Sequence, residues 1–443
     1  KLIVSFIGME KQEVNARNGR MEIRLRPDIQ SLNEVVVQVA YGTVKKESLI
    51  GSVSSVNAKD IEYRPVTSLA SVLDGTTTGV MVGSVGQPGE DATLLIRGFS
   101  SVNGSNLPLY VVDGMVYSGR ISDLNMMDIE SISVLKDAAS AALYGNRASN
   151  GVILIATKHS KSKELRMRLS VKQGLYTRGI SEYERLGADD FMEAIWLSNR
   201  NSLVSLHPDK YPTADAANAT ANASIMDVLK YNIYNVDNES LFDDNGKLAA
   251  GATVRDIYKN DLDWYSPIQR TGYRQEYNIS GEGGGEKSDY YVSLGYLDED
   301  GYMRNTGFDR LTLRANLNLT PRKWFKFGLQ ANGTYQNIQS CETEGAYATN
   351  AFYSARLMAP IYPVHLHNAS TGDYILDASG NKQYDDGSDN DRPQMAGRHL
   401  VWENELDSDK THRNTLAGQA YAEIRFLRDF TFTVKGNMSL TDS

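Results

Sequence analysis

Residues 93–114 read Thr-Leu-Leu-Ile-Arg-Gly-Phe-Ser-Ser-Val-Asn-Gly-Ser-Asn-Leu-Pro-Leu-Tyr-Val-Val-Asp-Gly. Two short apolar runs, Leu94–Ile96 and Leu109–Val112, each end in a charged residue followed by glycine. A Ser/Asn/Gly loop joins them, and such loops favour turns between strands. The stretch therefore predicts two paired strands with a polar tip, at the centre of a small sheet.

The residues on either side of this stretch complete a compact α+β unit over residues 48–162. A short amphipathic helix is expected at 68–73, where Ser68 can cap its first turn and Gly75 can end it. A strand at 132–135, a second helix at 138–143 and a buried strand at 151–157 follow.

A different pattern begins at Leu165, because apolar and polar residues then alternate strictly over runs of about ten residues. Such runs are long enough to cross a bilayer as tilted strands, although a soluble β-sandwich alternates equally well. Seven segments carry the pattern: 165–171, 273–281, 290–297, 311–319, 325–335, 416–426 and 430–440.

The lengths of the connections favour a membrane barrel over a sandwich. The connections at 282–287, 320–324 and 427–429 are short, and they alternate along the chain with connections that begin near 177, 298 and 337, the first and last of them long. Outer-membrane barrels have short periplasmic turns and long extracellular loops, whereas a sandwich has no reason to sort its loops in this way.

The composition of the 443-residue chain excludes several other classes. No run approaches the roughly 18 apolar residues of a membrane helix. The formal net charge of -9, with no basic patch, argues against nucleic acid as a partner. The single Cys341 allows no internal disulfide. No nucleotide-binding or nucleophile motif occurs, and the glycine run at 281–285 is a turn between strands.

Several motifs in residues 93–152 give the unit a family resemblance. Ile96-Arg97-Gly98 and Val112-Asp113-Gly114 are followed by the segment 128–137, and then by Ala-Leu-Tyr-Gly-Asn-Arg-Ala-Ser-Asn-Gly-Val at 142–152. In this order they resemble the plug domain of SusC/RagA-type TonB-dependent transporters. The plug signature residues are Arg97, Gly98, Asp113, Gly114, Lys136, Asp137, Tyr144, Gly145, Arg147, Asn150 and Gly151.

The resemblance implies a membrane β-barrel with an α+β plug in its lumen. Such a barrel has about 22 antiparallel strands, of which about seven are present here, so we expect the chain to be the N-terminal part of a larger protein. The expected domains are the end of a carboxypeptidase-regulatory-like β-sandwich (1–27, with strands at 1–7 and 21–26), a linker (28–47), the plug (48–162) and the first barrel strands (163–443).

The linker contains a segment of strong β propensity with no obvious partner strand and a polar, flexible sequel. It is either an ordinary strand or a segment that pairs with another chain. Resemblance to SusC-type proteins implies that it is the Ton box, with Ala40 where these proteins usually have glycine. The Ton box residues are Glu34, Val35, Val36, Val37, Gln38, Val39, Ala40, Tyr41 and Gly42.

The function implied is TonB-dependent import of an oligosaccharide or a peptide across the outer membrane of a Gram-negative bacterium, without enzymatic activity or a cofactor. The implied partners are TonB with ExbB and ExbD, a SusD-like lipoprotein lid and outer-membrane lipid. The plug and the N-terminal segment would reach the periplasm, and the long loops would be extracellular. The alternatives are a metal-chelate transporter, a receptor or adhesin without transport, and, third, an enzyme.

Several polar groups are candidates for binding. The plug tip could contact substrate, and an acidic group in a long loop offers oxygen ligands for calcium, although its spacing is not that of an EF-hand and a solvated loop is the simpler interpretation. The same loop has a His365-x-His367 pair, a weak metal signal, and another long loop has Trp196, Trp264 and expected helices at 188–197 and 225–234. The tip residues are Ser101, Asn103, Ser105 and Asn106, and the acidic residues are Asp385, Asp386, Asp389 and Asp391.

Overall fold

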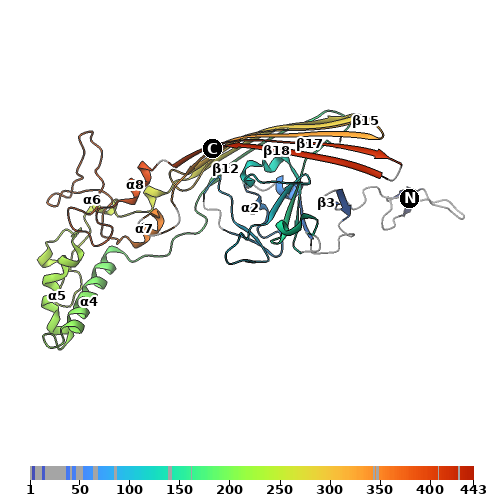
Figure 1. Ribbon diagram of the computed structural model, residues 1–443. Helices are drawn as coiled ribbons and strands as arrows, with labels where there is room; N and C mark the ends of the chain where they lie inside the picture. Colours follow the sequence, from blue (N-terminus) through green and yellow to red (C-terminus); the bar gives the residue numbers. More distant parts are fainter. Residues whose placement is uncertain are drawn as a thin grey trace. The chain divides into compact units, whose positions relative to one another are not determined.

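The computed structural model of the chain divides into two compact units, and each is described by itself (Figure 1). The first unit comprises residues 1–84 and 91–161, and the second comprises residues 85–90 and 162–443. The structure describes residues 2–4, 12–14, 36–39, 42–45, 53–62, 68–83, 87–137, 142–160, 162–342, 345, 349–407, 409–427 and 430–443.

The first unit is built on a mixed five-stranded sheet in the order β5-β10-β11-β8-β9. Its two central strands, β10 (Ile129–Leu135) and β11 (Val152–Thr157), are antiparallel, and β11 pairs with β8 in parallel. Their alternate side chains Ile132, Val134, Ile153 and Ile155 are fully buried with the helix α2, so this is the core of the unit. The remaining elements are β5 (Val53–Asn57), α1 (Ala58–Glu62), α2 (Leu69–Leu73), β6 (Val80–Val82), β7 (Leu94–Ile96), β8 (Leu109–Val112), β9 (Met115–Val116), and the 3-10 helices Ile121–Asp123, Met126–Asp128 and Ala142–Ala148.

The expected pairing of the two strands in residues 93–114 is wrong. Strand β7 pairs with β6, whereas β8 pairs with β11 and β9. The reason is local, because Arg97 (φ 61°) and Gly98 (φ 91°) both adopt left-handed conformations directly after β7 and turn the chain away. The expected helix at 68–73 is confirmed, since Ser68 Oγ accepts the Ala70 N–H at 3.2 Å.

The linker segment has a partner strand that the sequence did not reveal. Val36–Val39 (β3) forms an antiparallel hairpin with Gly42–Lys45 (β4), so the sequel expected to be flexible is a strand. Four of the predicted Ton box residues, Glu34, Val35, Ala40 and Tyr41, lie outside the described residues. Upstream, β1 (Leu2–Val4) pairs with β2 (Gln12–Val14), and the strand expected at 21–26 is outside the described residues, as is most of the helix expected at 138–143.

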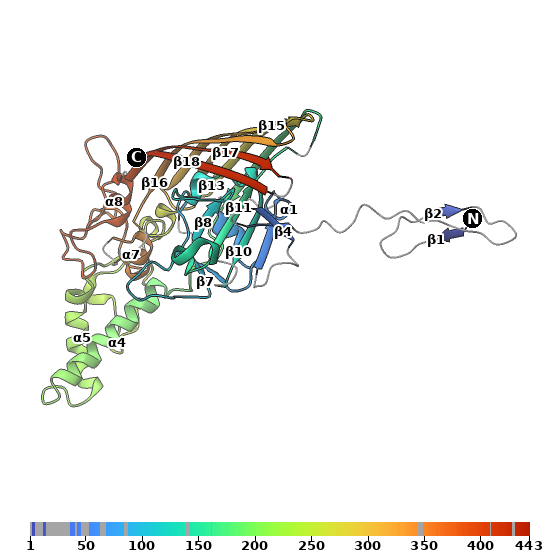
Figure 2. The same cartoon turned by 45° about the vertical axis from the view of Figure 1, so that its right-hand side comes forward.

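The second unit is a seven-stranded antiparallel sheet in which every strand pairs with the next in sequence (Figure 2). All seven alternating segments of the sequence are strands of this sheet, and the expected antiparallel order is confirmed. The strands are β12 (Arg166–Tyr176), β13 (Gly272–Gly284), β14 (Ser288–Asp300), β15 (Gly307–Arg322), β16 (Phe325–Ser340), β17 (Asp409–Phe426) and β18 (Phe430–Asp442).

The apolar face of this sheet is the exposed one. Leu169, Leu313 and Leu440 are 71, 53 and 57% exposed. The opposite face has buried polar side chains, among them Arg274, whose guanidinium binds Glu276 at 2.9 Å and Glu299 at 3.1 Å. A soluble sandwich has the reverse arrangement, so the sandwich alternative is excluded. One row of Cα partners across all seven strands shows the pattern: Leu169, Ile279, Leu294, Leu313, Gly333, Leu416 and Leu440.

The apolar face is a band with two aromatic edges. Tyr277, Tyr296 and Tyr335 lie in the next row toward the long loops, and Trp324 and several phenylalanines lie at the other end. Between Tyr335 and Phe325 lie ten residue steps of β16, which span roughly 25 Å at the usual tilt. Directly beyond the tyrosine row comes a row that is entirely polar: Gln173, Gln275, Asp298, Asp309, Asn337 and His412. The band has the height and the girdles of a bilayer-spanning sheet.

The connections are sorted between the two ends of the sheet, as expected. Residues 285–287, 323–324 and 427–429 connect strands at one end. Residues 177–271, 301–306 and 341–408 connect them at the other, where the helices gather (Figure 1). None of the described helices is long and apolar enough to cross a membrane.

The two long connections fold together around one apolar core. Its helices are α4 (Ala188–Leu206), α5 (Ala214–Leu229), α6 (Asp256–Lys259), α7 (Ala351–Leu357) and α8 (Leu400–Leu406), with 3-10 turns at Asn238–Ser240 and Ser266–Ile268. α5 begins eleven residues before the expected 225–234, because Ala217 and Ala221 continue the buried stripe of Ile225 and Leu229 at four-residue spacing. It ends at Leu229 because Lys230 is left-handed.

Residues 87–90 come from the plug sequence but belong to the second unit. The Gln87 side chain acts as a backbone mimic, since its Nε2 donates to the Cys341 carbonyl (2.5 Å) and its Oε1 accepts the Cys341 N–H (2.8 Å). Gly89, at φ 79°, lies against Phe308 so closely that a Cβ would be 2.5 Å from the ring.

The two long connections, residues 177–271 and 341–408, are called the loop region below. Trp196 and Trp264 belong to its core and are 1 and 2% exposed. The indole N–H of Trp196 donates to Asn222 (2.6 Å), and that of Trp264 donates to the Tyr362 carbonyl (2.8 Å). Packing therefore accounts for both tryptophans, and neither presents a face to a ligand.

Gly246→Ala is expected to destabilise the loop core. Gly246 has φ 79°, and an added Cβ would be 2.0 Å from the Trp196 ring. The variant combines left-handed strain with displacement of a buried ring, together about 2–5 kcal/mol. Gly251→Ala is the matched control, because Gly251 has φ 91° with nothing within 4 Å and its substitution adds strain alone. Hydrogen exchange of α4 in the full-length protein compares them, and equal protection in both variants would contradict the packing argument.

Candidate functional site

The plug signature residues form turns and strand ends. Asp113 is buried, and its carboxylate accepts both the N–H (2.9 Å) and the hydroxyl (2.7 Å) of Thr157. It thereby joins the end of β8 to the end of β11. Positive φ angles occur at Arg97, Gly98, Asp113, Gly114, Gly145 and Gly151, which accounts for all four glycines in the signature.

Lys136 is the one lysine of the signature, and it is almost fully buried. Its ammonium donates to Ser54 Oγ at 2.5 Å and Thr78 Oγ1 at 3.3 Å. Burial, and to a lesser degree the charge of Arg97, lowers the pKa of Lys136. Asp137 is half-buried, Tyr144 packs against the small cluster around Val152, and Arg147 is exposed. These positions form no catalytic constellation.

The plug tip is a loop fixed by two asparagines. Asn106 Oδ1 accepts the N–H groups of Ser100 (2.9 Å) and Ser101 (2.8 Å), and its amide donates to the Ser101 carbonyl. Asn150, from the signature, donates to the carbonyls of Ser105 (2.7 Å) and Leu107 (3.3 Å). Asn150, two residues before β11, therefore helps to fix the conformation of the tip.

The hydrogen bonds of the tip limit which of its side chains could contact substrate. Asn106 is used in the fold of the loop, Ser101 Oγ accepts the Gly104 N–H, and Ser105 Oγ accepts the Leu107 N–H. Among the described residues, Asn103 makes no side-chain hydrogen bond, so it is the member of the predicted set that stays available. Sequence reasoning missed the apolar groups of the tip, Phe99 and Val102, which are 78 and 99% exposed.

The acidic group in the second long loop is not arranged as a calcium site. Asp385 is buried and accepts the Tyr231 hydroxyl and the Gly387 N–H, both at 2.8 Å. Asp386 accepts the Ser388 N–H. Within the part of the chain that the structure describes, no three His, Cys, Asp or Glu side chains come together as metal ligands. Asp385, one of the four carboxylates of the calcium candidate, therefore already has partners within the fold.

His365 and His367 converge on one buried carboxylate from the first long loop. Asp261 Oδ1 accepts His365 Nδ1–H at 2.6 Å, and Asp261 Oδ2 lies 2.8 Å from His367 Nε2 and accepts the backbone N–H of His365. Burial acts to raise the pKa of Asp261, but the hydrogen bonds from both histidines outweigh it and hold the pKa below its ordinary value. One carboxylate thus links the two long loops through hydrogen bonds to both histidines.

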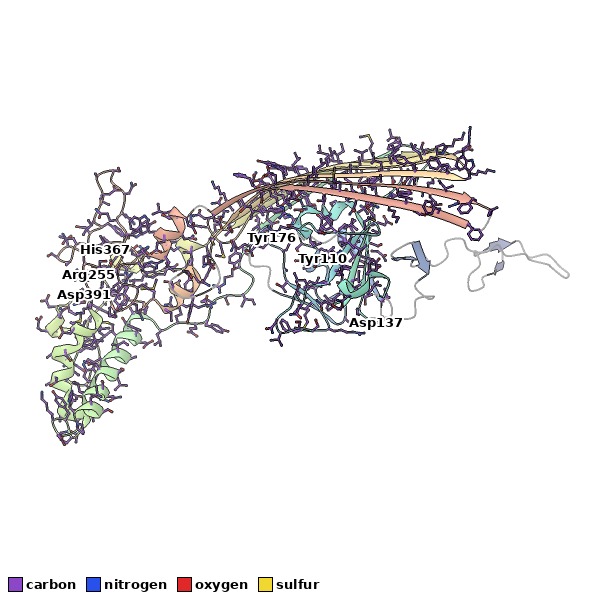
Figure 3. The ribbon with its side chains drawn as sticks, viewed as in Figure 1. Tyr110, Asp137, Tyr176, Arg255, His367 and Asp391 are labelled. Atoms are coloured by element: carbon purple, nitrogen blue, oxygen red, sulfur yellow. The ribbon has the colours of Figure 1, made fainter. Side chains whose placement is uncertain are left out.

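Both ring nitrogens of His367 face oxygen atoms. Its Nδ1 lies 2.9 Å from the carbonyl oxygen of Gly372, which can only accept, and its Nε2 faces the ionised Asp261. The rings of Tyr258 (4.5 Å between centroids) and Tyr374 (4.4 Å) pack against the His367 ring. Figure 3 marks the position of His367.

His399, in the same core, is held neutral. Its Nε2–H donates to the Val364 carbonyl at 2.9 Å, and its Nδ1 accepts the Trp402 N–H at 3.1 Å. One nitrogen therefore donates and the other accepts. Burial is the main reason that the pKa of His399 falls to about 4.

The comparisons with known proteins agree with this architecture. Residues 45–152 match the family model described as the TonB-dependent Receptor Plug Domain. The TonB-dependent receptor P39 of Formosa agariphila is 31% identical over 80% of this chain and 30% of its own length. The TonB-dependent receptor SusC of Bacteroides thetaiotaomicron is 29% identical over 96% of this chain and 38% of its own.

A solved structure gives the same fold. The RagAB peptide importer in its open-open state superposes with a TM-score of 0.65 over 92% of this chain and 42% of the other, at 23% identity. A plug-type unit followed by an antiparallel sheet with an exposed apolar band defines a TonB-dependent outer-membrane receptor. Within that class, the chain belongs to the SusC/RagA family. It spans about a third of the length of these two curated relatives.

Replacing His367 by phenylalanine is expected to loosen the loop at residues 364–385. An aromatic ring stays, but Asp261 loses the hydrogen bond from His367 and keeps only those from His365, which costs about 1–3 kcal/mol. Amide exchange of Leu366 and Ile375, which are hydrogen-bonded within this loop, measures the loss in the full-length protein. Adding Asp261→Asn should recover part of it. If the two single losses simply add in the double variant, the two side chains are not coupled.

Acidification is expected to weaken the loop core through His399. Its pKa is about 4 in the folded state and about 6.5 in an unfolded chain, so the stabilisation is complete above pH 6.5 and falls by about 1.4 kcal/mol per pH unit below it. Hydrogen exchange of the Trp402 amide between pH 7 and 5.5 measures this change of stability with pH. His399→Gln should flatten it, and His207→Gln, at an exposed histidine, should not. An unchanged slope in His399→Gln would refute the assignment.

Proposed function

We propose that the protein acts in TonB-dependent import of a nutrient, an oligosaccharide or a peptide, across the outer membrane. The observation that carries this proposal is the exposed apolar band of β12–β18, bounded by aromatic girdles and ended by a polar row. A sheet of this kind is stable only in lipid, with its polar face toward a lumen. The short turns would face the periplasm and the long loops the cell exterior.

The second support is the plug, which accounts for the need for energy. A barrel that contains a folded plug passes large substrates only when the plug is remodelled, and no described group provides that energy within this chain. Among the described strands β3 pairs with β4 alone, which leaves one edge of β3 to which TonB, with ExbB and ExbD, would add a strand. Because Val36–Val39 already pairs with Gly42–Lys45, TonB would bind the open edge of β3 or replace β4.

The loop region supports the remaining part of the proposal. Its two long connections form a folded core of their own at the end of the sheet with the long loops. Such a rigid platform suits a SusD-like lipoprotein lid, the partner expected for the SusC/RagA family. The solved relative RagAB is described as a peptide importer, and this leaves both a peptide and an oligosaccharide open for the present chain.

Val37→Pro in the full-length protein is expected to abolish uptake and leave substrate binding intact. Strand addition depends on main-chain donors, and proline removes one of them from β3. Val37→Ala keeps the main chain and should retain uptake. Deletion of residues 34–42 should reproduce the proline result. Uptake of radiolabelled nutrient by cells and equilibrium binding to the purified protein separate the two activities.

Each alternative function has its own outcome in this experiment. Full uptake in both the proline variant and the deletion would favour a receptor or adhesin that needs no TonB. Growth that depends on a ferric chelate, with no SusD-like protein copurifying, would identify a metal-chelate transporter. Turnover of a glycan or peptide by the purified protein would identify an enzyme.

A further inference from the structure

The loop region contains a pocket of about 400 Å³ that no part of the import mechanism above uses. Its walls come from the end of α5 with the turn that follows, and from the loop at 363–390. The volume is within the range of small-ligand sites. Figure 3 marks Arg255 and His367 in this region, and both line the pocket.

Four charged side chains of the pocket walls have polar atoms without a hydrogen bond to any described residue. Lys230, Asp237 and Glu239 are exposed, and within the described residues their side chains make no hydrogen bond or ion pair. Arg255 donates from Nε to the Tyr234 carbonyl at 2.8 Å, and its two terminal nitrogens have no hydrogen bond to any described residue. The walls therefore present two cations and two anions that are free to bind.

The acid at the base of the pocket, in contrast, is already satisfied. Asp385 accepts the Tyr231 hydroxyl and the Gly387 N–H. His367 is fixed between Asp261 and the Gly372 carbonyl. The base is thus a rigid support, and only the four wall charges remain for a ligand.

The aromatic rings of the pocket do not offer a stacking surface for a sugar. The Tyr258 ring lies between the Arg255 guanidinium, 5.8 Å from its centroid, and the His367 ring, at 4.5 Å. The Tyr231 ring packs edge-on against Tyr362 at 5.1 Å. Both rings are used in the fold, which disfavours carbohydrate as the occupant.

We propose that this pocket binds the zwitterionic ends of a short peptide. Lys230 and Arg255 would hold the terminal carboxylate, and Asp237 and Glu239 the terminal ammonium group. Two free charges of each sign in one small pocket match a ligand that has one of each. The inference rests on the pocket itself and does not require that the protein transports, so a failure of TonB-dependent uptake leaves it standing.

The test is calorimetric titration of the purified full-length protein with three probes of similar size. Gly-Ser-Gly is expected to bind, whereas the same peptide with an acetylated N-terminus and an amidated C-terminus, and neutral maltotriose, are expected not to bind at this pocket. Lys230→Met and Glu239→Gln should each weaken binding of Gly-Ser-Gly about tenfold. Lys323→Met and Asp244→Asn, two exposed charges outside the pocket, are the matched controls and should leave it unchanged.

Three results would overturn the proposal. Equal affinity for the free and the end-blocked peptide would show that the pocket does not recognise the terminal charges of the peptide. Binding of maltotriose that is weakened by the pocket variants would assign the pocket to carbohydrate. Binding of Gly-Ser-Gly that neither pocket variant changes would place the peptide site elsewhere in the protein.

Discussion

The hydrogen-bond register of the seven-stranded sheet is the constraint on which the second unit depends. Because side chains alternate between faces, a slip of one residue between two strands would move a leucine row to the polar face and an Arg or Asn row into lipid. The row from Leu169 to Leu440 shows that no such slip occurs between any two neighbours. The short connections fix this register, since two or three residues leave little freedom between partners.

The loop region buries its apolar residues, whereas the sheet of the same unit exposes them. Its apolar residues are inside, as in a soluble domain, and its charged groups meet as specific pairs. Two histidines of this region have different hydrogen-bond surroundings: His367 faces two acceptors, whereas His399 faces one acceptor and one donor. Residue type alone does not decide such surroundings.

Patterns that are local in sequence predicted the corresponding structure well. Strict alternation located all seven strands, the connection lengths indicated their sorting between the two ends, and Ser68 marked the start of α2. Interactions between distant residues were not visible in the same way. The partner of Leu94–Ile96 depends on the left-handed turn at Arg97, and α5 uses alanines as its buried stripe. Asp261 lies over 100 residues from the two histidines that it binds, so no spacing rule could have joined them.

The polar row that follows the tyrosine girdle fixes the height at which the sheet can lie in a bilayer. Sinking by one pair of residues would bring Asp298 and Asp309 below the headgroups, and rising by one would lift the tyrosines out of the interface. Because the loop core continues from these strand ends, its distance from the membrane surface is set by the same step. A single line of side chains thus sets the height of the loop core above the bilayer.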